Sequence, residues 1–214
     1  MTDTIDTGTL TAWISRFRDA VTEKREWLTE LDSAIGDADH GANMARGMAA
    51  VADKLGGEPP ATVDELLKGV GMTLVSSVGG ASGPLYGTFF LRMGMTAGAV
   101  TELDATALAT ALRAGLDGIV ARGKAEAGEK TMFDAMAPAV DALDAAIAGG
   151  AGMADAARTA ADTASAGRDA TLPLVARKGR ASYLGERSAG HLDPGAASTA
   201  ILFETLATTI ADRT

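Results

Sequence analysis

Three aspartates, Asp32, Asp37 and Asp39, lie within eight residues of one another. The run HGAN at residues 40–43 follows them at the predicted start of a helix. Magnesium prefers oxygen ligands and commonly takes one or two carboxylates, several waters and the phosphate oxygens of a substrate. A helix N-terminus behind the carboxylates offers N–H groups and the positive end of a dipole to phosphate. The pattern therefore predicts a site for Mg²⁺ and a phosphorylated ligand such as a nucleotide.

A set of helix caps is the alternative explanation for these aspartates. Asp is a common N-cap residue, because its side chain accepts a hydrogen bond from the first turn of a helix. A cap needs only one carboxylate, however, and three carboxylates this close repel one another without a cation. The sequence therefore favours a metal site with all three aspartates as its ligands.

Two further segments could contact phosphate. The glycine-rich run 79–84, GGASGP, allows close backbone approach, although a flexible turn between helices is the more common explanation of such a run. The segment 167–193 of this acidic protein carries Arg168, Arg177, Lys178, Arg180 and Arg187. Long loops are often functional and Arg binds phosphate through two parallel hydrogen bonds, while solvated loop charges are the ordinary alternative.

Three other features are less specific. The run DPG at 193–195 predicts an N-cap followed by Pro at the first helical position, and the same geometry could close a loop over a ligand. The run KTMFD at 130–134 most simply predicts a helix start with buried apolar residues. The two histidines, His40 and His191, lie beside turns that contain aspartate, and neither belongs to a nucleophile motif.

The elements that must position these residues are predicted to be helices. Leu10, Trp13, Phe17 and Val21 recur at helical spacing, and no segment alternates convincingly with the period of a strand. Caps, glycines and prolines bound eight predicted helices, at residues 9–31, 40–55, 62–78, 82–97, 103–121, 134–148, 151–166 and 194–212. Short links between them favour antiparallel neighbours, so the prediction is an all-α bundle.

Composition bounds the remaining possibilities. At 214 residues, 47% of them hydrophobic, the chain suits one domain that spans residues 1–214. It has no cysteine and residues 1–8 contain no secretory signal, so the cytoplasm is the predicted compartment. A net charge of −9 disfavours nucleic-acid binding. The uncharged stretch 69–91 is as long as a membrane span, but its glycines, proline and hydroxyl side chains argue against one.

Four blocks of the chain resemble a known family, the nucleotide-binding L subunits of bacterial dihydroxyacetone kinases. The blocks are residues 31–47 (LDSAIGDADHGANMARG), 71–90 (GMTLVSSVGGASGPLYGTFF), 122–132 (RGKAEAGEKTM) and 177–196 (RKGRASYLGERSAGHLDPGA). Four blocks in the right order are far more specific than any one motif. One departure is Ala38, between two of the aspartates, which is glycine in many relatives.

The resemblance implies an eight-helix antiparallel barrel with ADP or ATP bound at one end. It also implies two Mg²⁺ ions held by the three aspartates. The residues implied near the phosphates and ribose are His40, Gly41, Ala42, Asn43, Ala81, Ser82 and Arg180. Those implied to enclose the nucleotide are Gly123, Met132, Asp193, Pro194 and Gly195.

The same resemblance implies a role in phosphoryl transfer. The chain would be the L subunit of a phosphoenolpyruvate–glycerone phosphotransferase, a kinase linked to the phosphotransferase system. An M-type phosphocarrier partner would recharge bound ADP, and a K-type partner would hold dihydroxyacetone on a histidine. The chain would supply metal ligands and positioning but no covalent catalyst. Two alternatives stay open: a subunit of an ATP-dependent kinase for a related small ketose, and an ADP-loaded protein that binds a transcription regulator.

Overall fold

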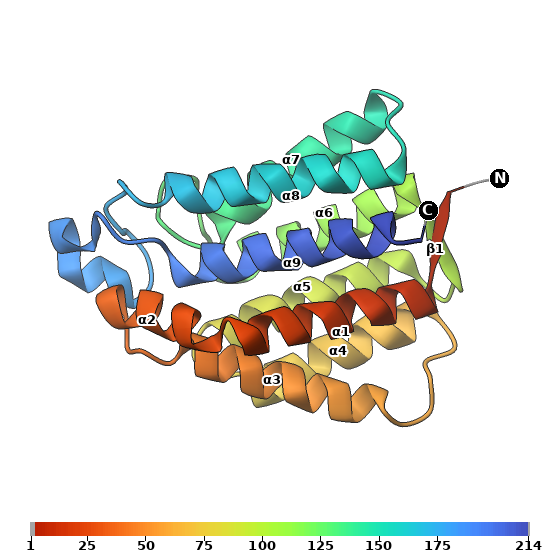
Figure 1. Ribbon diagram of the computed structural model, residues 1–214, viewed down its shortest axis with the longest axis horizontal. Coiled ribbons are helices and arrows are strands. Elements are labelled where there is room, and N and C mark those ends of the chain that lie inside the picture. Colours follow the sequence, from red (N-terminus) through yellow and green to blue (C-terminus); the bar gives the residue numbers. More distant parts are fainter. Residues whose placement is uncertain (1–2, 214) are drawn as a thin grey trace.

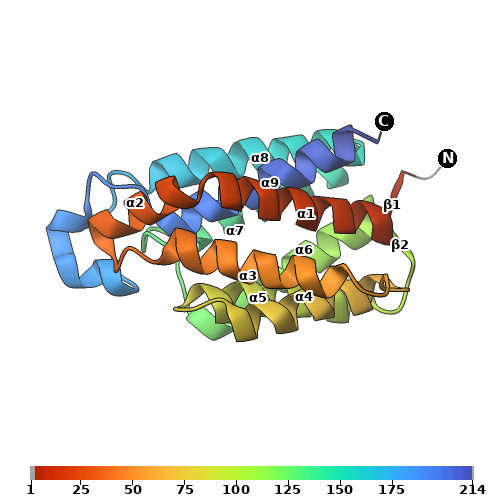
Figure 2. The same ribbon diagram turned by 60° about the horizontal axis from the view of Figure 1, so that its bottom comes forward.

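Helices make up most of the computed structural model, which describes residues 3–213 (Figure 1). Within these residues the α-helices are α1 (Thr7–Glu23), α2 (Arg25–Ile35), α3 (His40–Leu55), α4 (Val63–Ser77), α5 (Ser82–Ala97), α6 (Ala105–Gly123), α7 (Phe133–Ala148), α8 (Met153–Ala170) and α9 (Pro194–Ala211). A 3₁₀ helix, η1 (Arg180–Ser188), lies between α8 and α9. The long helices run along the long axis of the molecule (Figure 2). The predicted all-α fold is confirmed.

The predicted helix at 9–31 is divided into α1 and α2 at Lys24, whose φ and ψ are −92° and 12°. The break lies between the buried side chains of Val21 and Leu28, and none of the side chains between them is fully buried. Packing therefore does not hold this stretch of the helix straight. By contrast, α3 and α5 begin and end at the predicted residues.

A two-stranded sheet, absent from the sequence prediction, ties the chain start to the α5–α6 connection. Strands β1 (Thr4–Asp6) and β2 (Glu102–Asp104) pair antiparallel, with Ile5 opposite Leu103. Three residues are too few to show an alternating pattern in the sequence. Each strand ends in an aspartate that caps the next helix, since Asp6 and Asp104 accept backbone N–H groups of α1 and α6 at 2.8 Å.

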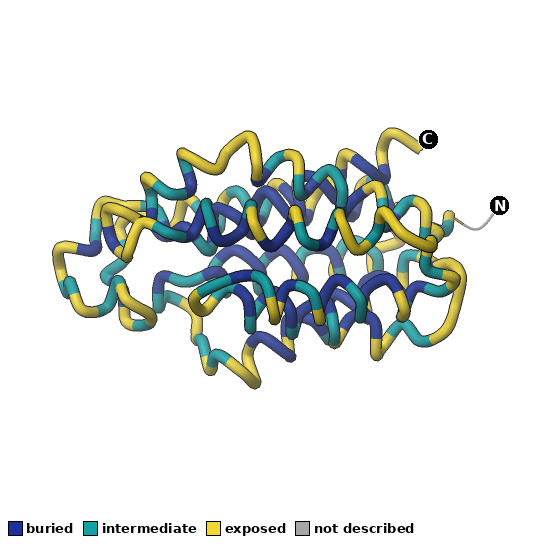
Figure 3. The backbone as a smooth tube through the Cα atoms, turned by 90° about the horizontal axis from the view of Figure 1, so that it is seen from below, coloured by how far each residue is buried: buried dark blue, intermediate teal, exposed yellow. Residues whose placement is uncertain are grey.

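Helix α9 lies in the core. Of its 18 residues, 14 are buried, as expected for a helix that is apolar all round. It packs against α1, α2, α7 and α8, and buried backbone runs through the interior of the bundle (Figure 3). Its N-terminal residues, Pro194 and those that follow, are therefore fixed in place by the whole bundle.

The uncharged stretch 69–91, which is as long as a membrane span, is divided between α4 and α5. Within residues 3–213 no helix is both long and apolar enough to cross a membrane.

Helices α4 and α5 meet at small residues. A Cβ atom on Gly71 would lie 2.7 Å from the Gly87 carbonyl oxygen, and one on Gly87 would lie 2.8 Å from the Gly71 carbonyl oxygen. Glycine at both positions lets the helices approach closely, which places the start of α5.

Successive long helices reverse direction along the bundle. As a result, α3, α5, α7 and α9 begin at the same end of the molecule, where α2 and η1 also lie (Figure 1). Strand β1 and the last turn of α9 lie at the opposite end.

Candidate functional site

The converging helix starts surround a cavity of about 430 Å³, a volume typical of small-molecule sites. Residues at the starts of α3, α5, α7 and α9 line it, together with the end of α6 and part of η1. Each helix start carries a partial positive charge and N–H groups without an intrahelical acceptor. The up-and-down order of the helices therefore concentrates four such ends of the described chain on one cavity, which favours an anionic ligand.

The three aspartates meet at one side of this cavity. One carboxylate oxygen from each of Asp32, Asp37 and Asp39 lies within 4.8 Å of the others. Asp32 is buried, and its Oδ2 accepts the backbone N–H groups of Asp39 at 2.8 Å and His40 at 3.1 Å. Asp39, although it precedes α3, makes no side-chain cap hydrogen bond. One carboxylate thus organises the turn, and capping does not explain the other two.

The turn that carries the aspartates holds a residue in an unfavourable conformation. Ala38 has a φ of 61°, in the left-handed region where a Cβ atom costs energy and glycine is favoured. This explains in physical terms why glycine suits this position. The conformation directs Asp37 and Asp39, on either side of Ala38, toward Asp32.

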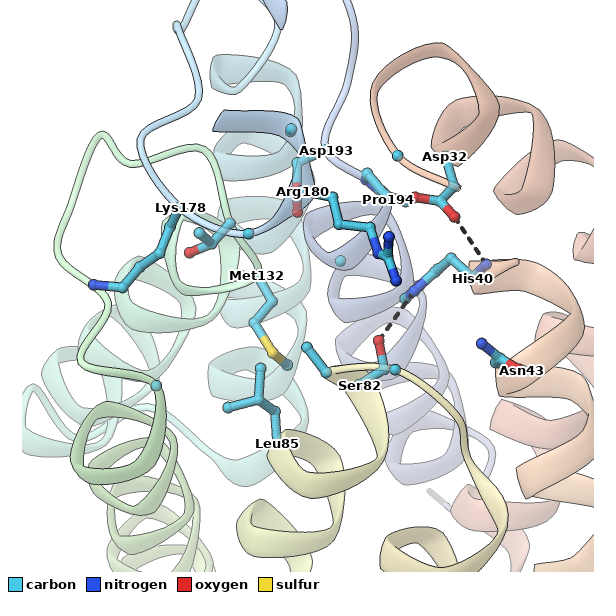
Figure 4. Close-up of a pocket in the computed structure, with 18 of the residues that line it drawn as sticks. Asp32, His40, Asn43, Ser82, Leu85, Met132, Lys178, Arg180, Asp193 and Pro194 are labelled. Carbon is cyan, nitrogen blue, oxygen red and sulfur yellow. Dashed lines mark hydrogen bonds between the residues drawn. The ribbon is translucent and has the colours of Figure 1, made fainter. Parts of the chain in front are cut away.

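His40 is buried at the start of α3 between two other helices. Its Nδ1 lies 3.1 Å from the Ser82 hydroxyl (Figure 4). Its Nε2 lies 2.9 Å from the Ser198 hydroxyl. The Ser198 hydroxyl also lies 3.0 Å from the Gly195 carbonyl oxygen and 2.8 Å from the Tyr86 hydroxyl, so His40 belongs to a polar network that joins α3, α5 and α9. Burial lowers the pKa of His40, although Asp32 and Asp39 oppose this, so the ring is a neutral bridge between helices.

Arg180 reaches the aspartates from η1. Its Nε lies 2.9 Å from Oδ2 of Asp37, and its side chain is 70% exposed. Figure 4 shows it extending from the loop toward the side of the cavity that holds Asp32 and His40. A cation that bridges to one aspartate without being buried is free to contact a phosphate group in the same space.

Apolar side chains gather on the opposite wall of the cavity, and Lys178 lies on that side too (Figure 4). Leu85 and Met132 face the polar groups across the cavity (Figure 4), and Ile119 lines the same space. Charged and hydrogen-bonding groups on one wall and apolar side chains on the other suit a ligand with a phosphate end and a flat, weakly polar end.

Asp193, the N-cap of α9, carries a buried carboxyl group and lines the cavity. It accepts the Ala196 N–H at 2.7 Å. Burial raises its pKa to about 7, while the Ala196 N–H and the ammonium of Lys130 counteract that effect. Asp193 therefore retains a proton more readily than an ordinary carboxyl group.

Most of the residues predicted from the sequence line this one cavity: Asp32, Asp37, Asp39, His40, Asn43, Ala81, Ser82, Gly123, Met132, Arg180, Asp193, Pro194 and Gly195. Gly41 and Ala42 do not line it. Gly41 faces α2, where a Cβ atom would lie 2.0 Å from the Arg25 carbonyl oxygen. Contact of a ligand with the backbone of either residue stays a prediction.

The sequence reasoning missed two groups of lining residues. Leu85, Ile119 and Arg122 lie in helices and carried no signal of their own. Lys130 was assigned only to a helix start, and no local pattern in the sequence indicated that it lines the cavity.

Comparisons with known proteins agree with this geometry. A family model described as the DAK2 domain matches residues 34–208. The ADP-binding subunit DhaL of the PTS-dependent dihydroxyacetone kinase of Lactococcus lactis is 47% identical over 215 residues, which cover 97% of this chain and 99% of that protein. The ADP-binding subunit DhaL of the PEP-dependent dihydroxyacetone kinase of Escherichia coli is 46% identical over 195 residues, 91% of this chain and 93% of that protein.

A solved structure has the same fold. The dihydroxyacetone kinase from C. freundii, in complex with AMP-PNP and Mg²⁺, superposes with a TM-score of 0.70 at 29% sequence identity. The match covers 93% of this chain and 33% of that chain, so the segment shared with this chain is one part of a longer protein.

Proposed function

The chain belongs to the DAK2-domain family, and on this basis we propose that it is the ADP-binding subunit of a phosphoenolpyruvate-dependent dihydroxyacetone kinase. The observation that carries the proposal is the single cavity where four helix starts, three carboxylates and an apolar wall meet. The match to two ADP-binding subunits, over more than 90% of this chain and of each relative, supports it. We also propose that residues 1–214 act as one nucleotide-binding domain.

The aspartate cluster fits Mg²⁺. Its donors are all carboxylate oxygens, they lie within 4.8 Å of one another, and Asp32 is held in place by two backbone N–H groups. Three carboxylates exceed the one or two that a single Mg²⁺ usually takes, which supports two ions. Magnesium would neutralise the charge of the transferred phosphoryl group.

The remaining cavity residues would position the nucleotide. The starts of α3 and α5, with His40, Asn43, Ala81 and Ser82, would receive the phosphates beside Arg180. The apolar wall would receive the base, and the residues that enclose it would be Gly123, Met132, Asp193, Pro194 and Gly195. No side chain is assigned as a nucleophile, so the acceptor and the phosphate donor would come from a K-type subunit with bound dihydroxyacetone and an M-type phosphocarrier.

Because partner subunits are proposed to supply the sugar and the phosphate donor, we predict that the isolated chain has no kinase activity. Purified protein with dihydroxyacetone and either ATP or phosphoenolpyruvate should form no dihydroxyacetone phosphate, because in this proposal the K-type subunit holds the sugar. Adding K-type and M-type subunits of a related system with the general phosphotransferase proteins should restore turnover from phosphoenolpyruvate. A coupled dehydrogenase assay measures the product. An inactive aspartate variant is the control for contaminating kinases. Turnover by the wild-type chain alone, above that control, would refute the subunit assignment.

Retention of ADP separates the proposal from its alternatives. A subunit recharged in place should keep ADP through purification, and native mass spectrometry should find it bound. An ATP-dependent ketose kinase should instead exchange its nucleotide freely. A regulator-binding role would be seen as nucleotide-dependent capture of a transcription regulator in a pull-down.

Arg180→Ala is expected to weaken ADP binding by about 10- to 150-fold, the effect of losing one hydrogen bond to a charged group. The melting temperature of the ligand-free protein should not change, because an exposed ion pair such as Arg180–Asp37 contributes little to stability. Isothermal titration calorimetry with ADP and Mg²⁺ measures the affinity. Arg187→Ala is the matched control, since Arg187 is exposed in the same 3₁₀ helix and does not line the cavity. Equal affinities for the two variants would remove Arg180 from the site.

A further inference from the structure

Lys130 is a buried cation whose partners are all backbone carbonyl groups. Only 1% of the residue is exposed. Its ammonium donates to the carbonyl oxygens of Thr171 at 2.8 Å and Leu174 at 3.1 Å, and also to that of His191. The Leu172 carbonyl lies farther away, at 3.4 Å. An ammonium has three N–H donors, so Lys130 is fully satisfied without a carboxylate in direct contact.

These carbonyl groups belong to both ends of one segment, residues 171–192, which we call the basic loop. Thr171 and Leu174 lie where the chain leaves α8, and His191 lies just before the N-cap of α9. Lys130 therefore holds the two ends of the loop together and against the start of α7. The loop between them carries Arg180 to the cavity.

The backbone of Lys130 is consistent with a position fixed by its surroundings. Its φ is 62°, in the left-handed region that most residues other than glycine avoid. Such conformations persist where the surrounding structure holds them, often at functional sites. Glycine would adopt this conformation without strain but would leave the carbonyl groups without their donor.

Other contacts join the basic loop to the same connection between α6 and α7. The Arg177 N–H donates to the Glu129 carbonyl at 3.1 Å, and Lys178 pairs with the Glu129 carboxylate at 3.2 Å. Lys178 also donates to the Lys124 carbonyl. The Lys178 contacts lie near the surface, where ion pairs contribute little. The buried Lys130 contacts are the stronger tie.

We propose that Lys130 is a positioning residue that fixes the basic loop, and with it Arg180, over the nucleotide cavity. The effect on nucleotide binding rests on the function proposed above, whereas the anchoring of the loop can be tested without a nucleotide. Lys130 acts through the loop and need not touch the ligand.

The first test uses trypsin, because the basic loop contains its own cleavage sites at Arg177, Lys178, Arg180 and Arg187. In ligand-free Lys130→Met, which keeps the length of the side chain but removes its donors, cleavage at these sites should become about 10- to 100-fold faster. Mass spectrometry assigns the cut positions. Cleavage elsewhere in the chain should not change, which distinguishes a released loop from general unfolding.

Lys124→Met is the matched control. Lys124 lies in the same connection, has a similar φ of 50° and is exposed. In Lys124→Met, trypsin should cleave the basic loop at the wild-type rate. Wild-type protection of the loop in Lys130→Met, or equally faster cleavage throughout the chain, would overturn the proposal.

The second test restores the missing cation chemically. Lys130→Gly relieves the backbone strain and leaves space lined by carbonyl oxygens, so methylammonium chloride should return loop cleavage toward the wild-type rate. Sodium chloride at the same concentration should not. Failure of methylammonium to protect the loop in a variant with wild-type circular dichroism would contradict a role for the ammonium.

The third test connects the loop to the site. The dissociation constant for ADP with Mg²⁺ rises by the reciprocal of the fraction of molecules whose loop stays docked, and we expect an increase of about tenfold in Lys130→Met. Methylammonium should reverse it in Lys130→Gly. Unchanged ADP binding by a variant whose loop is freely cleaved would overturn the positioning role. If the wild-type chain itself binds no ADP, the proposed function fails, and trypsin alone decides whether Lys130 anchors the loop.

Discussion

Mg²⁺ together with ADP is expected to raise the melting temperature of ligand-free protein by about 5–11 °C. A ligand at 100 times its dissociation constant stabilises the folded state by about 2.7 kcal/mol, and for a domain of this size each kcal/mol shifts the melting temperature by about 2–4 °C. ADP with excess chelator should have little effect, because the carboxylates of Asp32, Asp37 and Asp39 then repel the phosphates. Differential scanning fluorimetry measures the shift.

Asp37→Asn and Asp39→Asn should each lose most of this stabilisation and keep the helical circular dichroism. These two positions are chosen because Asp32 also accepts two backbone N–H groups, so its replacement would disturb the turn itself. Asp117→Asn, an exposed position on α6, is the control and should keep the full shift. Equal stabilisation with and without magnesium, or full shifts in both variants, would mean that the aspartates do not bind a metal.

Gly41→Ala should destabilise the protein by about 3 kcal/mol, at the upper end of the usual cost of overpacking. The added Cβ atom would lie 2.0 Å from the Arg25 carbonyl oxygen and 2.9 Å from the Thr29 backbone nitrogen. Backbone atoms cannot move aside as the end of a side chain can, so α3 must shift away from α2. The melting temperature should fall by about 6–12 °C, and ADP affinity should fall with it, since α2 and α3 carry the aspartate turn.

Gly69→Ala provides the comparison for Gly41→Ala. Gly69 lies inside α4, and a Cβ atom there would meet no atom within 4 Å. Alanine should stabilise this helix by about 0.5–1 kcal/mol. If the two variants melt at similar temperatures, the close approach of α2 and α3 at Gly41 is not a constraint on the fold.

The parts of the fold that the sequence predicted well are those with local signals at both ends. Helix α3 begins after the aspartate turn and ends before Gly56, and α5 begins within the glycine-rich run and ends before Gly98. The break at Lys24 and the η1 helix had no such signals. They depend on which side chains find a partner in the folded protein, and that is decided by residues far away in the sequence.

The residues of the candidate site likewise fall into those with a local signal in the sequence and those without one. The aspartates could be found because they lie in one turn, where spacing alone brings them together. Lys130 could not, because lysine is usually exposed and its burial depends on carbonyl groups 41 to 61 residues later in the chain. Gly41 was interpreted as part of a phosphate site, and the structure adds a packing reason for a glycine there.

Strand β1 and the last turn of α9 lie at the end of the bundle opposite the cavity (Figure 1). This placement determines how the protein can be joined to others. A polypeptide attached at either end would emerge away from the helix starts that receive the ligand. Gene fusion, surface tethering and circular permutation through a linker between β1 and α9 should therefore leave the cavity open. The same topology suits longer proteins such as the C. freundii kinase, in which the matched region is about a third of the chain.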